Sequence, residues 1–187
     1  MEISGLILCG GESKRMGNDK GLLLKQEEPW VKLLANLFRG MGLNYHLSIK
    51  ATQMEAYSKF FNPDLFIVDA VEVPGPLRGI FSAHLAFPET NWLILACDMI
   101  EMTEEAMQNI LKVAANHPDY DYWIYKNEIF YEPFCGIYSA RGLKKLIQQY
   151  REGSLERFSM QSVFKQAAVF PFPVGSYAAA FKNLNQI

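Results

Sequence analysis

The sequence contains few cysteines and no hydrophobic run long enough to cross a membrane. Its 187 residues include three cysteines, at positions 9, 97 and 135, and no two of them have the close spacing of a metal-binding motif. Each lies in or just after a strand-like apolar run, so we expect buried thiols in a reducing compartment rather than disulfides or a zinc site. No apolar run approaches the ~20 residues that span a bilayer, and no basic segment followed by an apolar core marks a signal peptide. We therefore expect a cytoplasmic protein with no membrane partner.

A strong excess of charge of either sign is also absent. The chain has 18 Lys and Arg against 20 Asp and Glu, which gives a formal net charge of −2. This balance argues against general nucleic-acid binding, although a local basic pocket for an anionic ligand remains compatible with it. Hydrophobic residues make up 50% and charged residues 20% of the chain, as in a globular protein. A chain of this length predicts one domain, over residues 1–187, with a sizeable core.

Apolar runs alternate with helical patterns along the chain, which is typical of an α/β fold with a mostly parallel sheet. Helices are expected where apolar residues recur at helical spacing, and Thr103 is placed to cap one of them. The expected strands are Gly5–Cys9, Tyr45–Ile49, Leu65–Val68, Trp92–Ala96, Tyr122–Tyr125, Phe134–Tyr138 and Ala167–Phe172, and the expected helices are Trp30–Met41, Met54–Phe61, Leu77–Phe87 and two that follow Thr103 and Ser139. The segment 119–132 is expected to be less regular, and Phe60, Phe61, Phe158 and Phe164 to lie in the core.

The first strand leads into a loop whose composition suits a phosphate. Residues 10–21 contain four glycines, which let backbone N–H groups approach phosphate oxygens, and three basic residues, Lys14, Arg15 and Lys20. An arginine can bind two phosphate oxygens at once. The glycine spacing matches neither a Walker A motif nor a dinucleotide fingerprint. The loop therefore predicts a nucleotide site of another kind.

Two aspartates follow buried strands of the predicted sheet. Asp98 is the first charged residue after Trp92–Cys97, and Asp69 ends the strand Leu65–Val68. In an open parallel sheet, ligands bind beyond the carboxyl ends of the strands. Asp98 can hold Mg²⁺ there, or it can cap the following helix. Asp69 can face the ligand, or it can be a turn residue.

The segment from Leu8 to Lys20 reads Leu-Cys-Gly-Gly-x-Ser-x-Arg-Met-Gly-x-Asp-Lys, and it resembles the signature of the MobA-like nucleotidyltransferases. Within that family it is most similar to the molybdenum cofactor guanylyltransferases. The resemblance implies a three-layer α/β/α, Rossmann-like fold with a mostly parallel sheet. It also implies transfer of GMP from GTP to the phosphate of molybdopterin, with release of pyrophosphate.

The resemblance further implies which residues form the site. A second hallmark, Gly-Pro-Leu-x-Gly, stands at residues 75–79 and shapes the base pocket in the family. Asp98 matches the metal-binding aspartate, although Met99-Ile100 follows it here in place of the usual Met-Pro. Asp69 matches an aspartate near the guanine or ribose. The expected nucleotide-binding residues are Leu8, Gly10, Gly11, Lys20, Asp69, Gly75, Pro76, Leu77 and Asp98, with Arg15, Lys20 and Asp98 as the catalytic residues and Mg²⁺ bound at Asp98.

The last third of the chain resembles the acceptor side of the family. Glu132–Tyr138 is similar to a strand of the form Pro-x-x-x-x-Tyr, and Asn183 and Asn185 match an Asn-x-Asn motif linked to molybdopterin; a solvated tail is the alternative for this pair. The resemblance also implies transient contact with proteins that make molybdopterin or mature molybdoenzymes.

Two other functions stay open at this point. Related folds transfer CMP, UMP or dTMP to sugar phosphates or to molybdopterin, but Leu8-Cys9-Gly10-Gly11 has the form that goes with GTP in the family, whereas Ala-Ala-Gly goes with CTP. The other alternative is a protein that binds a nucleotide or molybdopterin without turnover. The acceptor phosphate is already an anion, so the reaction needs no nucleophilic triad but depends on positioning and charge neutralisation.

Overall fold

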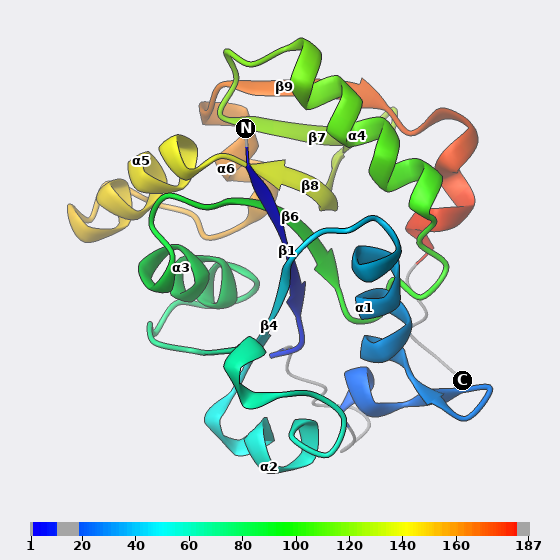
Figure 1. The fold of residues 1–187 in the computed structure, drawn as a ribbon. Helices are drawn as coiled ribbons and strands as arrows, with labels where there is room; N and C mark the ends of the chain where they lie inside the picture. The colour runs from blue at the N-terminus through cyan, green and yellow to red at the C-terminus, as the bar shows by residue number, and fades with distance from the viewer. Residues whose placement is uncertain (1, 11–18, 183–187) are drawn as a thin grey trace.

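The fold is described from a computed structural model of the chain, which describes residues 2–10 and 19–182. Seven strands form one sheet in the order β5-β4-β1-β6-β8-β7-β9 (Figure 1). Two further strands of two residues each pair with one another apart from it. The strands are β1 (Ile3–Leu8), β2 (Leu24–Lys25), β3 (Glu28–Pro29), β4 (Tyr45–Ile49), β5 (Phe66–Val68), β6 (Asn91–Ala96), β7 (Tyr122–Lys126), β8 (Tyr131–Tyr138) and β9 (Val169–Pro173).

The sheet is parallel on one side and mixed on the other. Strand β1 pairs in parallel with both β4 and β6, and β5 pairs in parallel with β4. Strand β8 runs antiparallel between β6 and β7, and β9 is parallel to β7. Because β5, β4, β1 and β6 share one direction, their carboxyl ends meet at one edge of the sheet, where ligands of open α/β sheets bind.

Helices cover both faces of the sheet (Figure 1). Helices α1 and α4 pack on one face, and α3, α5 and α6 pack on the other. This arrangement confirms the expected three-layer α/β/α architecture. The helices are α1 (Trp30–Gly40), α2 (Met54–Tyr57), α3 (Leu77–Ala86), α4 (Glu104–Asn116), α5 (Ala140–Arg151) and α6 (Met160–Gln166), with the 3-10 helices η1 (Lys20–Leu22), η2 (Ala51–Gln53), η3 (Pro63–Leu65) and η4 (Gly175–Phe181).

Strand β6 shows how one apolar run serves both layers. Its side chains alternate between the two faces, as in any extended strand. Leu93 and Leu95 therefore join the core on the α1 side, whereas Trp92 and Ile94 join the core on the α3 side, and all four are fully buried. A central strand with two buried faces reads as a continuous hydrophobic run, which is what the sequence has there.

Local sequence features explain two of the helices. On α1, Val31, Leu34 and Phe38 are buried at helical spacing, and a Cβ at Gly5 of β1 would overlap the Phe38 ring. At the start of α4, the Thr103 side chain accepts a hydrogen bond from Ala106 N at 3.3 Å, as expected for a cap.

The structure corrects several local expectations. The helix expected over Met54–Phe61 has only its first turn, α2, and Phe60 is 46% exposed rather than in the core. The segment 119–132 is more regular than expected, since half of it forms β7 and the start of β8. Helix α6 was not predicted, because its seven residues are too few to show a clear helical period.

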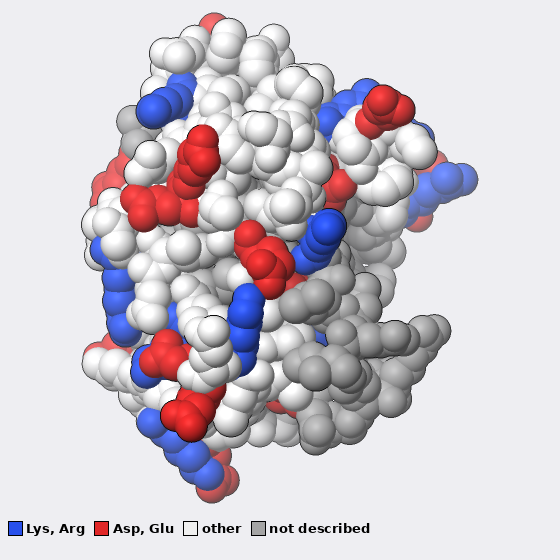
Figure 2. Space-filling view, turned by 90° about the vertical axis from the view of Figure 1, so that its right-hand side faces the viewer, with Lys and Arg blue, Asp and Glu red and all other residues white. Residues whose placement is uncertain are grey.

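On the face seen in Figure 2, basic and acidic side chains of the described residues are interspersed and neither sign forms an extended patch. Within the part of the chain that the structure describes, no helix is both long and apolar enough to cross a membrane.

Candidate active site

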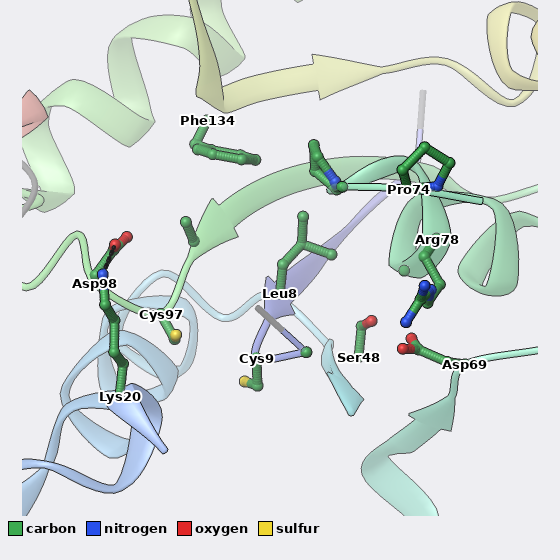
Figure 3. Close-up of a pocket in the computed structure, with 15 residues that line it drawn as sticks. Leu8, Cys9, Lys20, Ser48, Asp69, Pro74, Arg78, Cys97, Asp98 and Phe134 are labelled. Atoms are coloured by element: carbon green, nitrogen blue, oxygen red, sulfur yellow. Dashed lines mark hydrogen bonds and ion pairs between the residues drawn. The ribbon is translucent and has the colours of Figure 1, made fainter. Parts of the chain in front are cut away.

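A cavity of about 490 Å³ opens at the edge of the sheet where the parallel strands end. Strands β1 and β6 supply its middle, the segments after β5 close one end, and β8 borders it (Figure 3). This is the place that the topology favours for a ligand. The residues that line it are Leu8, Cys9, Gly10, Lys20, Ser48, Asp69, Pro74, Gly75, Pro76, Arg78, Gly79, Ala96, Cys97, Asp98 and Phe134.

At one end of the cavity, Lys20 and Asp98 form an ion pair. Lys20 Nζ lies 3.0 Å from Asp98 Oδ2, and the two side chains are 25% and 18% exposed (Figure 3). Lys20 begins η1, and Asp98 follows the end of β6. The sequence predicted each residue for the site separately, and the fold brings them together. This end of the cavity therefore carries a partly desolvated cation beside a carboxylate.

The Asp98 carboxylate fits the needs of a magnesium ion shared with a nucleotide. Magnesium is commonly held by one or two carboxylates, with phosphate oxygens and water as its other ligands. Within residues 2–10 and 19–182, no hydrogen bond engages Asp98 Oδ1, and no three His, Cys, Asp or Glu side chains gather into a closed metal cage. The donor set suits a hard cation at an open site better than a structural zinc ion.

The opposite end of the cavity carries Asp69 and Arg78 (Figure 3). Burial raises the pKa of the Asp69 carboxyl above its ordinary value, while the positive charges of Arg78 and Lys50 act in the other direction. Arg78 Nε donates a hydrogen bond to the Val73 carbonyl at 3.2 Å, and the guanidinium is directed toward Asp69. This end therefore presents a hydrogen-bond acceptor and a planar cationic donor side by side.

Glycines let the backbone come close to this end of the cavity. A Cβ at Gly10 would lie 3.3 Å from Asp69 Oδ2, and one at Gly79 would overlap the Ser48 hydroxyl. Gly75 has φ +69°, a conformation that side chains rarely adopt. The turn after β5 and the start of α3 can therefore lie directly against the end of β4.

The structure places most of the sequence-predicted residues on the cavity. Leu8, Gly10, Gly75 and Pro76 line it, together with the three predicted charged residues Lys20, Asp69 and Asp98. Leu77 does not line it, because its fully buried side chain packs in the core on the α3 side of the sheet. Its side chain therefore has a structural role in the core, and the predicted contact of this residue with the nucleotide stays a prediction.

Four predicted residues lie outside the described part of the chain. These are Gly11 and Arg15 of the glycine-rich loop, and Asn183 and Asn185 near the end of the sequence. Their roles stay predictions.

Sequence reasoning missed Arg78 and Ser48. Ser48 is a polar residue, 1% exposed, between the apolar Leu47 and Ile49 near the end of β4, and that contrast was a usable signal. Arg78 stands at the variable position of Gly-Pro-Leu-x-Gly, so the motif gave no reason to single it out. Its position in the first turn of a helix that starts at the ligand edge was the only hint.

Comparison with known proteins gives the family. The model of the MobA-like NTP transferase domain matches residues 5–168. The chain is 32% identical over 142 residues to a molybdenum cofactor biosynthesis bifunctional protein of Synechocystis. The aligned region is 75% of this chain but only 40% of that protein. The chain is also 28% identical over 153 residues to a probable molybdenum cofactor guanylyltransferase of Nostoc, and the aligned region is 81% of this chain and 72% of that relative.

Solved structures share the fold. The crystal structure of molybdopterin-guanine dinucleotide biosynthesis protein A from Archaeoglobus fulgidus has a TM-score of 0.78 at 20% identity and covers all of this chain and 93% of that one. A Mycobacterium tuberculosis protein crystallised in complex with manganese has a TM-score of 0.65 at 15% identity, over 93% of this chain and 89% of that one. The family match extends over β1 to α6 and includes the described residues of the cavity. The chain therefore belongs to the MobA-like NTP transferase family.

Proposed function

We propose that the chain transfers the GMP moiety of GTP to the terminal phosphate of molybdopterin and releases pyrophosphate. The observation that carries this proposal is the polarity of the cavity at the sheet edge, with Lys20 and Asp98 at one end and Asp69 and Arg78 at the other. A triphosphate needs cations at one end of its site, and a purine base needs matched donors and acceptors at the other. The names of the relatives in Synechocystis and Nostoc support the same acceptor chemistry.

The base end has the hydrogen-bonding groups that guanine requires. Guanine presents N–H donors on N1 and N2 beside the acceptors O6 and N7. The Asp69 carboxylate can accept from the donors, and the Arg78 guanidinium can donate to the acceptors. Adenine offers an acceptor at N1 and a donor at N6, so the same pair would face it with the wrong polarity. The pair therefore favours GTP over ATP.

The phosphate end supplies charge neutralisation. In the proposed reaction, an oxygen of the acceptor phosphate attacks the α-phosphorus of GTP, and the bond from that phosphorus to the bridging oxygen breaks. Pyrophosphate leaves with the electron pair, and a new diphosphate linkage joins GMP to molybdopterin. Lys20 would neutralise the charge that develops on the leaving pyrophosphate, and Arg15 is predicted to assist.

Magnesium is the metal that we propose for this site, with Asp98 as its protein ligand. The Asp98 carboxylate would hold the ion, which would supply charge neutralisation for the phosphates of the nucleotide. Asp98 would hold the ion close to Lys20, whose ammonium lies 3.0 Å from the carboxylate.

The acceptor would enter beside Phe134. This half-buried side chain of β8 lines the cavity near Asp98 (Figure 3). The last described residues, Phe181 and Lys182, border a second cavity of about 620 Å³ together with Glu132 of the same strand. Asn183 and Asn185 follow them directly in the sequence, which supports their predicted role toward molybdopterin. The three free, buried cysteines suit a cytoplasmic enzyme.

Calorimetric titration of the protein with GTP, ATP and CTP in the presence of Mg²⁺ tests the nucleotide part of the proposal. GTP is expected to bind most tightly, and Asp69→Asn is expected to remove most of the preference. Tighter binding of CTP would change the assignment to a cytidylyltransferase. No binding of any of the three nucleotides would overturn the proposed function.

A further inference from the structure

The half-buried carboxylate of Asp19 accepts three hydrogen bonds from described residues. Asp19 Oδ1 accepts hydrogen bonds from Gly21 N and from the Tyr57 hydroxyl, both at 3.0 Å. Its other oxygen, Oδ2, accepts a short hydrogen bond from Gln53 Nε2. Asp19 caps η1, and Lys20 is the next residue in the chain. Because both oxygens have partners on α2, η1 and η2, Asp19 is an anchor rather than a metal ligand.

Gln53 connects this anchor to two strands of the sheet. Its Nε2 also donates to the carbonyl of Cys9 at 3.1 Å, directly after β1. Its Oε1 accepts from Lys50 N at 2.7 Å, directly after β4. One side chain therefore ties the ends of β1 and β4 to the residue that precedes Lys20.

Tyr57 supplies a further hydrogen bond to Asp19, from its hydroxyl to Oδ1. The side chain is fully buried, and burial together with nearby negative charge, including that of Asp19, raises the pKa of its phenol. This shift favours the protonated phenol, which donates to the Asp19 carboxylate. A Cβ at position 21 would overlap the Tyr57 hydroxyl, so Gly21 is needed for this approach.

We propose that Tyr57 and Gln53 are positioning residues for Lys20. By holding Asp19, they fix the start of η1 and so place the Lys20 ammonium 3.0 Å from the Asp98 carboxylate. Neither residue lines the cavity, so both act through Asp19 and Lys20. This inference rests on the proposed function, because it assigns Lys20 to the phosphates of a bound nucleotide.

The variant Tyr57→Phe removes only the hydroxyl. Hydrogen bonds to charged groups are among the stronger ones, so we expect about a tenfold loss in kcat for pyrophosphate release, with little change in the KM for GTP. Tyr45→Phe is the matched control, since Tyr45 is also buried and its hydroxyl has no partner within the described residues. The control is expected to keep both parameters. Equal effects of the two substitutions would overturn the inference.

A double-mutant cycle tests whether Tyr57 acts through Lys20. In the Lys20→Ala background, Tyr57→Phe should cause no further loss of kcat, because the group that it positions is gone. The same tenfold loss in both backgrounds would show that Tyr57 acts on turnover by another route, and it would overturn the inference.

Hydrogen–deuterium exchange gives a readout that needs no nucleotide. Tyr57→Phe, but not Tyr45→Phe, should speed exchange of the Gly21 amide, whose acceptor is Asp19. Unchanged exchange of the Gly21 amide in Tyr57→Phe would overturn the proposed role of Tyr57 in holding Asp19, even if the protein binds GTP. A wild-type protein that shows the expected exchange but binds no nucleotide would instead overturn the proposed function, and with it the role of Lys20.

Discussion

Lys20 Nζ lies 3.0 Å from Asp98 Oδ2, although 78 residues separate the two in the sequence. The contact arises because β1 and β6 are parallel neighbours, so the segments that follow them reach the same edge of the sheet. A second ion pair, between Lys25 and Glu101, lies nearby in the sequence but is exposed on both sides, at 41% and 45%. The described residues therefore contain a half-buried pair, for which we propose a function, and a surface pair that can be compared with it directly.

Replacement of Asp98 by alanine should abolish most of the turnover. The residue is the proposed metal ligand, and loss of one transition-state contact of this kind costs about 10²–10³ in rate. Measurement of pyrophosphate release at saturating GTP and Mg²⁺ checks this. Glu101→Ala serves as the control and should stay within about twofold of wild type, since exposed ion pairs contribute little. Near-normal turnover of Asp98→Ala would refute the assignment.

Lys20→Ala should separate metal binding from catalysis. Without the ammonium, the Asp98 carboxylate loses a competing cation, so its affinity for Mn²⁺ in the absence of nucleotide should rise severalfold. Turnover should fall by about 10²–10³ in the same variant. Titration with Mn²⁺ followed by electron paramagnetic resonance measures the first effect. Lys25→Ala should change neither quantity, and a fall in Mn²⁺ affinity in Lys20→Ala would contradict the account.

Asp69→Asn should stabilise the nucleotide-free protein at neutral pH, by about 0.5–2 kcal/mol, because functional sites often sacrifice stability. Burial raises the pKa of this carboxyl in the folded state. Below the unfolded-state pKa the group is protonated in both states and has no effect. As pH rises through the folded-state pKa, the buried charge increasingly favours unfolding. In thermal melts from pH 4 to 8, the Tm of Asp69→Asn should therefore exceed that of the wild type by an amount that grows with pH. A difference in Tm that shrinks as pH rises would contradict the prediction.

Gly79→Ala should destabilise the protein by about 1–3 kcal/mol through overpacking. The new methyl group would overlap the Ser48 hydroxyl, so the additional change Ser48→Ala should restore part of the loss. Denaturant unfolding of the single and double variants measures both. Gly40→Ala is the control, because its Cβ would lie 3.8 Å from Glu104 Oε2, which is an ordinary contact. Alanine in place of glycine in a helix is expected to raise the free energy of unfolding by about 0.5–1 kcal/mol. A Gly79→Ala protein as stable as wild type would show that β4 and α3 can separate there at no cost.

The sequence was sufficient for the fold class and for one aspartate at each end of the cavity. Buried parallel strands read as continuous apolar runs, and the first charged residue after such a run lies at the ligand edge, which located Asp98 and Asp69. Periodicity also located α1 and α4, because each buries one face over three turns.

The sequence was insufficient where contacts join distant segments. The anchor of Asp19 by Gln53 and Tyr57 spans 34 and 38 residues, and nothing in the local pattern around any of the three signals it. The direction of β8 was equally hidden, since an apolar strand reads the same whether it runs parallel or antiparallel to its neighbour. Leu77 was assigned to the site because its motif lies there, but its side chain points into the core.

Transfer of label from GTP tests the central claim most directly. The protein is incubated with molybdopterin, Mg²⁺ and GTP that carries a radioactive α-phosphorus, and in parallel with GTP labelled at the γ-phosphorus. The account predicts that the α-label moves to molybdopterin while the γ-label appears in pyrophosphate, and that Asp98→Ala stops both. Retention of the α-label in free GTP or GMP, with molybdopterin unlabelled, would contradict it.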